Sequence, residues 1–226
     1  MRLTRLVSNK GTSNGGGLMI EGMEMLTVRN CTLQSNDAAT SGGGVFVSGQ
    51  AILLAQDTLY SNNVARGSSD SEGGGALYIN DRAVVTSTND RYSNNRATKG
   101  YGGGLYAVNG AEWTCSSCTL QNNTAYHHGG AVYTLSAKVS FTDNTVLRSN
   151  EAKTGDGGGL YWASEGKLSV SHTSFQSNRA LQEDQGRGGA IAFQYPVDFN
   201  LSNVLLQSNE ANYGGGVYSP EGTPSF

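Results

Sequence analysis

The sequence predicts an all-β solenoid, a right-handed single-stranded parallel β-helix of about eight coils with three short strands in each coil. Three observations support this fold class. A Ser-Asn corner recurs along the whole chain, and each corner is followed by a Gly-Gly-Gly or Gly-Gly-Ala turn. The segments between these markers alternate apolar and polar residues with a period of two, as strands do. Because one motif recurs from end to end, we expect one domain over residues 1–226.

The corner asparagines set the period of the repeat. Aligned on this corner, they are Asn9, Asn36, Asn62, Asn94, Asn123, Asn150, Asn178 and Asn209, with neighbours 26 to 32 residues apart. Helical repeats of this length require apolar residues at a 3.6-residue spacing and good helix formers, whereas these segments are rich in Gly, Ser, Thr and Asn. The frame of leucine-rich repeats is also missing. We expect the asparagine amides to stack from coil to coil as a structural ladder.

The strand after the glycines is the most regular element. It reads GGGLMI, GGGVFV, GGALYI, GGGLYA, GGAVYT, GGGLYW, GGAIAF and GGGVYS. The fourth position is always aliphatic: Leu18, Val45, Leu77, Leu105, Val132, Leu160, Ile191 and Val217. Alternation predicts that these side chains point inward and stack at a rise of about 4.8 Å per coil.

The second and third strands supply the rest of the predicted core. In the second strand alternate residues face inward, such as Ile52 and Leu54 in one coil and Val84 in the next. In the third strand the inward position lies three residues before the corner asparagine: Leu6, Leu33, Leu59, Leu120, Leu147, Phe175 and Leu206. Arg91 interrupts this column, so we expect a bulge or a shift of register there.

Composition excludes several classes of function. Charged residues make up 15% of the chain and the net charge is −3, which leaves no basic surface for nucleic acid. No stretch reaches the roughly 18 apolar residues of a membrane-spanning segment, and the first residues lack the apolar core of a secretory signal. Three cysteines cannot form a multi-bridge framework. We expect no metal and no cofactor.

Candidate catalytic residues are few. Asp57, Asp90 and Asp143 follow the second strand in their coils but are offset in register, so no paired carboxylates of a glycosidase are predicted. His127 and His128 suggest an acid–base or metal pair, but adjacent side chains diverge and a solvated loop is favoured. We therefore predict no catalytic residue.

Two other features have more than one interpretation. The CxxC spacing of Cys115 and Cys118 suggests a redox pair or half of a zinc site, whereas a local disulfide or two small core residues explain it more simply. The longest loops, residues 64–72 and 180–187, are either specificity loops or solvated linkers.

The fifth position of the glycine strand is the strongest binding candidate. It is aromatic in most coils, and alternation points it outward. The candidate binding residues are Tyr78, Tyr106, Tyr133, Tyr161 and Tyr218. An exposed row of rings would stack on sugars or contact a protein. The alternative is that the tyrosines stabilise the sheet surface or lie beneath a loop.

The motifs resemble a known family. Phe175-Gln-Ser-Asn178 followed by Gly188-Gly-Ala-Ile191 matches the FxxN and GGAI repeats of the chlamydial polymorphic membrane proteins. Related LxxN and GGGL, GGGV or GGAV forms extend the resemblance over residues 3–219. The resemblance implies a surface-exposed adhesin that forms the passenger of an autotransporter. Since no segment resembles that family's C-terminal anchor, we expect a fragment, a short relative or a passenger segment.

These observations predict a non-catalytic surface or secreted β-helix that binds a glycan or a cell-surface protein through an outer face. We expect an extracellular or cell-surface location, with signal and anchor outside this sequence. The alternative function is a carbohydrate-active enzyme, such as a polysaccharide lyase, hydrolase or epimerase, and a plain spacer is a third. Open strand edges at both ends predict fraying or end-to-end self-association.

Overall fold

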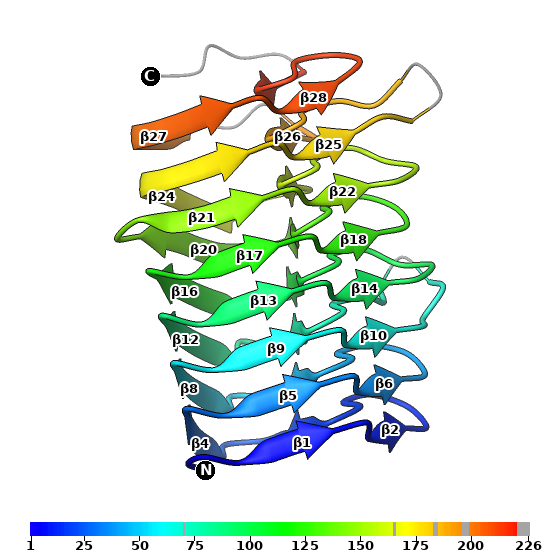
Figure 1. The fold of residues 1–226 in the computed structure, drawn as a ribbon, viewed down its shortest axis with the longest axis vertical. Helices are drawn as coiled ribbons and strands as arrows, with labels where there is room; N and C mark the ends of the chain where they lie inside the picture. The colour runs from blue at the N-terminus through cyan, green and yellow to red at the C-terminus, as the bar shows by residue number, and fades with distance from the viewer. Residues whose placement is uncertain (70, 165, 183–184, 196–198, 221–226) are drawn as a thin grey trace.

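The computed structural model describes residues 1–69, 71–164, 166–182, 185–195 and 199–220. Its regular structure consists of 29 strands and includes no helix within those ranges. The strands wind into a parallel solenoid of about seven turns with three sheets along its length (Figure 1). The predicted fold class is therefore confirmed. In the part of the chain that the structure describes, no helix is long and apolar enough to cross a membrane.

The glycine strands form one eight-stranded sheet. They are β3 (Leu18–Ile20), β7 (Val45–Val47), β11 (Leu77–Ile79), β15 (Leu105–Val108), β19 (Val132–Leu135), β23 (Leu160–Trp162), β26 (Ile191–Phe193) and β29 (Val217–Tyr218). Their register aligns the predicted aliphatic column from Leu18 to Val217. From Val45 to Ile191 these side chains are almost fully buried, so this prediction is confirmed.

The second and third strands share a 13-stranded sheet that bends within each coil. The second strands are β4 (Met25–Arg29), β8 (Ile52–Gln56), β12 (Val84–Thr88), β16 (Glu112–Ser116) and β20 (Ala137–Thr142). The third strands are β1 (Arg5–Val7), β5 (Thr32–Gln34), β9 (Leu59–Ser61), β13 (Arg91–Ser93), β17 (Thr119–Gln121) and β21 (Thr145–Arg148). In the last two coils β24 (Gly166–Gln176) and β27 (Asn200–Gln207) span both positions. Residues such as Asn30, Asp57 and Asn89 form the bend with positive φ, a conformation that Asn and Asp tolerate well.

A third sheet, of eight two-residue strands, follows the corner. They are β2 (Lys10–Gly11), β6 (Asp37–Ala38), β10 (Val64–Ala65), β14 (Arg96–Ala97), β18 (Thr124–Ala125), β22 (Glu151–Ala152), β25 (Arg179–Ala180) and β28 (Glu210–Ala211). The sequence does not predict these strands, because two residues are too few to show an alternating pattern. The coils from β4 to β23 therefore have four short strands each rather than three, whereas the coils of β24 and β27 have three.

A ladder of asparagine side chains joins the coils at the corner. It runs through Asn9, Asn36, Asn63, Asn95, Asn123, Asn150, Asn178 and Asn209. Each Nδ2 donates to the Oδ1 of the next asparagine at 2.9–3.0 Å. The same Oδ1 also accepts a backbone N–H from the coil before, as Asn95 Oδ1 does from Asn63. The ladder is confirmed, but two of its predicted members are wrong.

Asn62 and Asn94 are not ladder residues. Both are exposed and precede the ladder position, with φ of 55° and 57°. In most other coils serine occupies this left-handed position, as Ser35 and Ser149 do. Each of these two coils has two consecutive asparagines at the corner, so the sequence does not show which one belongs to the ladder. The prediction named the first asparagine of each pair. The ladder residues in these coils are Asn63 and Asn95.

Because of this error of one residue, the predicted inward and outward faces of the third strands in the two coils are exchanged. Tyr60 and Tyr92, rather than Leu59 and Arg91, occupy the inward column and pair with Leu33 and Leu120. Both tyrosines are fully buried, and their rings stack at a centroid distance of 4.7 Å. The structure therefore has no bulge at the predicted position, since a shift of one residue exchanges the two faces of a strand.

The predicted inward and outward faces of the second strands in these two coils are also exchanged. The register aligns Leu53 with Leu26 on one side and with Val85 on the other, and all three face inward. Ile52 and Leu54, which were predicted to be buried, therefore point outward with Val84.

The corrected ladder predicts unequal effects for one substitution at neighbouring positions. Asn63→Ser removes the side-chain amide and with it four hydrogen bonds to buried groups of the neighbouring coils, so it should lower the free energy of unfolding by about 3 kcal/mol. Asn62→Ser is the matched control and should cost no more than about 0.5 kcal/mol, because serine occupies that position elsewhere. Urea unfolding measures both, and a larger loss for Asn62→Ser would contradict the ladder assignment.

Candidate binding surface

The tyrosine row lies outside the main core but is not exposed. Tyr78, Tyr106, Tyr133 and Tyr161 align from coil to coil, as predicted. Their exposed fractions are only 0–7%, and with Phe46 they form a second apolar cluster. The prediction of an exposed tyrosine platform is therefore wrong, and the alternative, that the tyrosines lie beneath a loop, is the one that the burial supports.

Side chains from two neighbouring loops cover the row. The ring of Tyr101 lies 4.7 Å from that of Tyr133, and His128 stacks on Tyr161 at 4.3 Å. Farther along, Tyr218 is half-buried beneath the guanidinium group of Arg187, 5.1 Å from the ring centroid. Within the described part of the row, Tyr78, Tyr106, Tyr133 and Tyr161 therefore offer little ring surface for a sugar to stack on.

His127 and His128 pack against these tyrosines and are not a solvated loop. His128 Nδ1 accepts the backbone N–H of Asp156 at 2.8 Å. Burial, and then the neighbouring His127, lower the pKa of His128 to about 4, so it is neutral at pH 7. His127 stacks on Tyr101 at 5.1 Å. Among the described residues, no group of three or more His, Cys, Asp or Glu side chains is placed to hold a metal ion.

The remaining candidates are also dispersed. Cys115 and Cys118 form a buried local disulfide with a Cα–Cα distance of 5.9 Å. Asp57 accepts a hydrogen bond from Asn89 at 2.6 Å, and Asp143 is exposed. Hydrogen bonds from Ser116 and Thr142 lower the pKa of Asp143. Asp90 is buried inside the coil, so the structure does not bring the three carboxylates together.

The two long loops give little further information. In the first, Arg66 forms an ion pair with Asp37, while Asp70 lies outside the described residues. In the second, residues 183–184 also lie outside the described part of the chain.

An apolar patch, which sequence reasoning missed, lies on the outer face of the 13-stranded sheet. We call it the methionine patch, and it consists of Met23, Met25, Ile52, Leu54 and Val84. Met23 is 83% exposed, Met25 64% and Leu54 37%, while Ile52 and Val84 are half-buried. The pairings of β4 with β8 and of β8 with β12 place Met25, Ile52 and Val84 side by side. The patch was hidden because Ile52, Leu54 and Val84 were assigned to the core.

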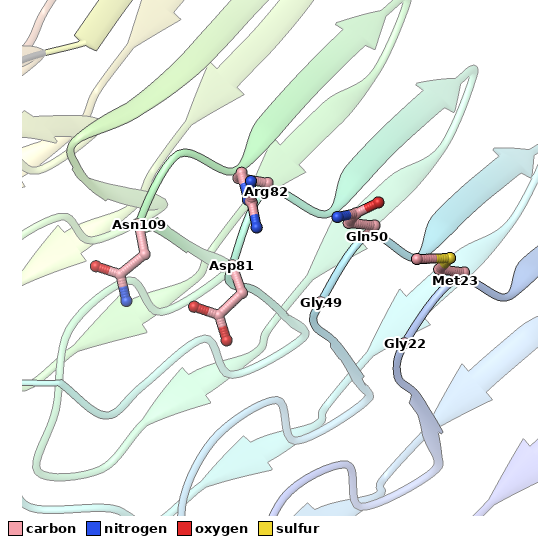
Figure 2. A pocket seen from close by; sticks show the side chains of 7 residues that line it. All are labelled: Gly22, Met23, Gly49, Gln50, Asp81, Arg82 and Asn109. Atoms are coloured by element: carbon pink, nitrogen blue, oxygen red, sulfur yellow. The ribbon is translucent and has the colours of Figure 1, made fainter.

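A shallow pocket of about 390 Å³ adjoins this patch at the turns before the second strands (Figure 2). Its lining comes from four successive turns: Gly22, Met23, Gly49, Gln50, Asp81, Arg82 and Asn109. Gly22 and Gly49 have φ of 81° and 79°, and a Cβ on Gly49 would lie 2.9 Å from the backbone of Gly22. Glycine therefore keeps the floor of the pocket free of side chains, and Asp81 and Arg82 supply a charged rim.

Comparisons with known proteins agree with this architecture. The family model for the right-handed β-helix region matches residues 6–197. A "Probable outer membrane protein pmp19" of Chlamydia pneumoniae is 29% identical over 140 residues, covering 55% of this chain and 14% of the relative. The chain thus spans a small part of that protein's length, and the resemblance to the chlamydial proteins is confirmed as a distant similarity. No solved structure gives a significant match.

The covered tyrosine row predicts a loss of stability when its rings are removed. The double variant Tyr106→Ser/Tyr133→Ser should lower the free energy of unfolding by at least about 3 kcal/mol, because each truncation leaves a cavity in the second apolar cluster. Tyr213→Ser, at a ring that is 55% exposed, is the control and should change it little. Unchanged thermal unfolding of the double variant would show that the row is not covered in solution.

Proposed function

The chain belongs to the right-handed β-helix family, and from this premise we propose that it is a non-catalytic, surface-displayed segment that binds a protein partner through the methionine patch. The observation that carries the proposal is the exposure of Met25 and Leu54 on the outer face of the sheet and of Met23 in the turn before β4. Contiguous apolar side chains in water mark interaction sites in soluble proteins.

The chemistry of the patch favours a protein over a glycan. Its five residues are aliphatic or thioether side chains, whereas sugars are recognised by aromatic faces and converging hydrogen-bond groups. Methionine adapts its shape to an apolar partner surface. The adjoining pocket offers space for one side chain of the partner, and Asp81 and Arg82 at its rim give polar contacts that fix orientation.

Because the sheet beneath the patch is already ordered, binding of a partner loses little backbone conformational entropy. Strand β8 pairs with β4 on one side and β12 on the other over five residues each. The backbone that carries Ile52 and Leu54 is therefore already ordered before a partner arrives. Beyond the loss of translational and rotational freedom, association then costs mainly the ordering of side chains, of which the two methionines are the most flexible.

A surface location is part of the proposal. It is supported by the similarity to a protein named as a probable outer membrane protein, which is much longer than this chain. We propose that the β-helix extends from a larger protein and presents the methionine patch outside the cell.

The positions of the carboxylates support a non-catalytic role. Asp57 and Asp143 are three coils apart, which corresponds to about 14 Å at the spacing of adjacent strands. Glycosidases hold their two carboxylates about 5 to 10 Å apart. Asp90, which follows β12 between them, points into the core, with 1% of its surface exposed.

Binding to cultured epithelial cells tests the proposal. The labelled chain should bind saturably, and Met25→Ser/Leu54→Ser should weaken binding at least about tenfold, because central apolar side chains carry most of the energy of an interface. Leu205→Ser is the matched control, since Leu205 is 51% exposed but lies on β27, far from the patch. It should bind like the parent chain.

Treatment of the cells separates the two classes of partner. Protease treatment should abolish binding, while enzymatic removal of surface glycans should leave it intact. Loss of binding after glycan removal alone would contradict a protein partner. Equal binding by the patch variant and the parent chain would contradict the assignment of the patch.

A further inference from the structure

A carboxylate lies inside the solenoid without a full set of hydrogen bonds. Asp90 Oδ1 accepts the backbone N–H of Thr58 at 2.9 Å, whereas Oδ2 has no hydrogen-bond partner among the described residues. The side chain is 1% exposed. The buried residues at the equivalent position in other coils carry no carboxylate: Cys31, Thr58, Cys118, Thr145 and Thr173.

Polar side chains of two coils surround Asp90. The hydroxyl groups of Tyr92 and Ser87 are 2.6 Å apart, and Trp113 Nε1 donates to the same serine at 3.1 Å. In the preceding coil Tyr60 occupies the position of Tyr92, but Ala55 occupies the position of Ser87 and has no hydroxyl group. The buried hydroxyl of Tyr60 therefore also lacks a hydrogen-bond partner within the described structure.

The charged group that acts on the pKa of Asp90 is a second carboxylate rather than a cation. Asp57, at the bend before β9, adds a second carboxylate, and Tyr60 on β9 and Tyr92 on β13 are neutral phenols. Cys31 faces Tyr60, and Arg91, beside Asp90, is exposed on the opposite face of the strand. Burial raises the pKa of Asp90 to about 7, against partial opposition from the hydrogen bond that Thr58 N–H donates and from the nearby hydroxyl groups of Ser87 and Tyr92.

We propose that Asp90 is a pH-sensitive element of the solenoid, protonated in the folded chain under mildly acidic conditions and ionised above neutral pH, where its buried charge loosens the coil of β12 and β13. The protonated carboxyl offers one O–H donor to the cluster, which the ionised form lacks. An ionised Asp90 would be a buried charge without a counter-ion, an arrangement that folded proteins avoid.

The direction of the pH effect follows from the difference between the pKa of Asp90 in the unfolded chain and in the folded chain. In the unfolded chain Asp90 ionises near its ordinary pKa of 3.8, while the folded chain keeps the proton up to a pKa of about 7. Between these values unfolding releases a proton, so stability falls as the pH rises and stays low above about 7. His128, with a pKa lowered to about 4 from 6.5, gives the opposite slope between those two values. The difference between the parent chain and an Asp90 variant therefore isolates the effect.

Thermal unfolding of Asp90→Asn and Asp90→Thr between pH 5 and 9 tests the proposal. Threonine is compatible with this position because Thr58, Thr145 and Thr173 occupy it in other coils. From the lower to the higher pH, the Tm of the parent should fall relative to that of each variant by at least about 4 °C. Asp143→Asn removes an exposed carboxylate at a neighbouring bend and is the control, with a profile parallel to the parent. Parallel profiles for the Asp90 variants would overturn the proposal.

Tryptophan fluorescence gives a local readout that does not depend on the Asp90 variants folding. The chain has two tryptophans, so Trp162→Phe leaves Trp113, which is hydrogen-bonded to Ser87, as the single reporter. Its emission should titrate near neutral pH. Adding Asp57→Asn should lower the midpoint, because the negative charge that raises the pKa of Asp90 is removed. A flat Trp113 signal across the same range would overturn the proposal.

Discussion

A continuous column of asparagine amides, buried from Asn36 to Asn178, fixes the register on which the rest of this structure depends. Each amide bonds the next one and also accepts a backbone N–H, so a coil displaced by one residue would leave several buried polar groups without partners. Strand faces alternate with a period of two, and such a displacement would also exchange interior and surface. The ladder therefore decides which side chains form the core and which meet solvent.

The limits of prediction follow from the same constraint. The glycine strands were predicted correctly because each has its own anchor, a glycine with positive φ three residues before the aliphatic residue, as Gly102 precedes Leu105. In the coils of Asn63 and Asn95 the anchor was ambiguous, since Asn-Asn pairs offer two amides for one ladder position. The wrong amide placed Tyr60 on the outer face of its strand, and a separate error in the alternation of the second strands hid the methionine patch.

The tyrosine row shows a second limit, since a side chain that points out of a solenoid is not thereby exposed. Alternation predicted the direction of Tyr106 correctly, but Tyr106 is covered by Tyr101, and Tyr161 in the same row is covered by His128, and no local pattern connects these covering residues to the row. The structure therefore has two apolar layers on this side, and the face left bare is that of the 13-stranded sheet. The candidate binding surface thus moves from the aromatic row to the methionine patch, on a backbone ordered by its neighbours on both sides.

Nitration of the folded chain by tetranitromethane, followed by peptide mass spectrometry, tests the register and the covered row together. Of the 11 tyrosines, Tyr126, Tyr195 and Tyr213 are 43–58% exposed and should react quickly. Tyr60, Tyr92 and Tyr106 are fully buried and should remain unmodified until the chain is unfolded. Modification of Tyr60 and Tyr92 in the folded chain at the rate of Tyr213 would contradict the assigned register. Equally fast modification of Tyr106 would contradict the covered row.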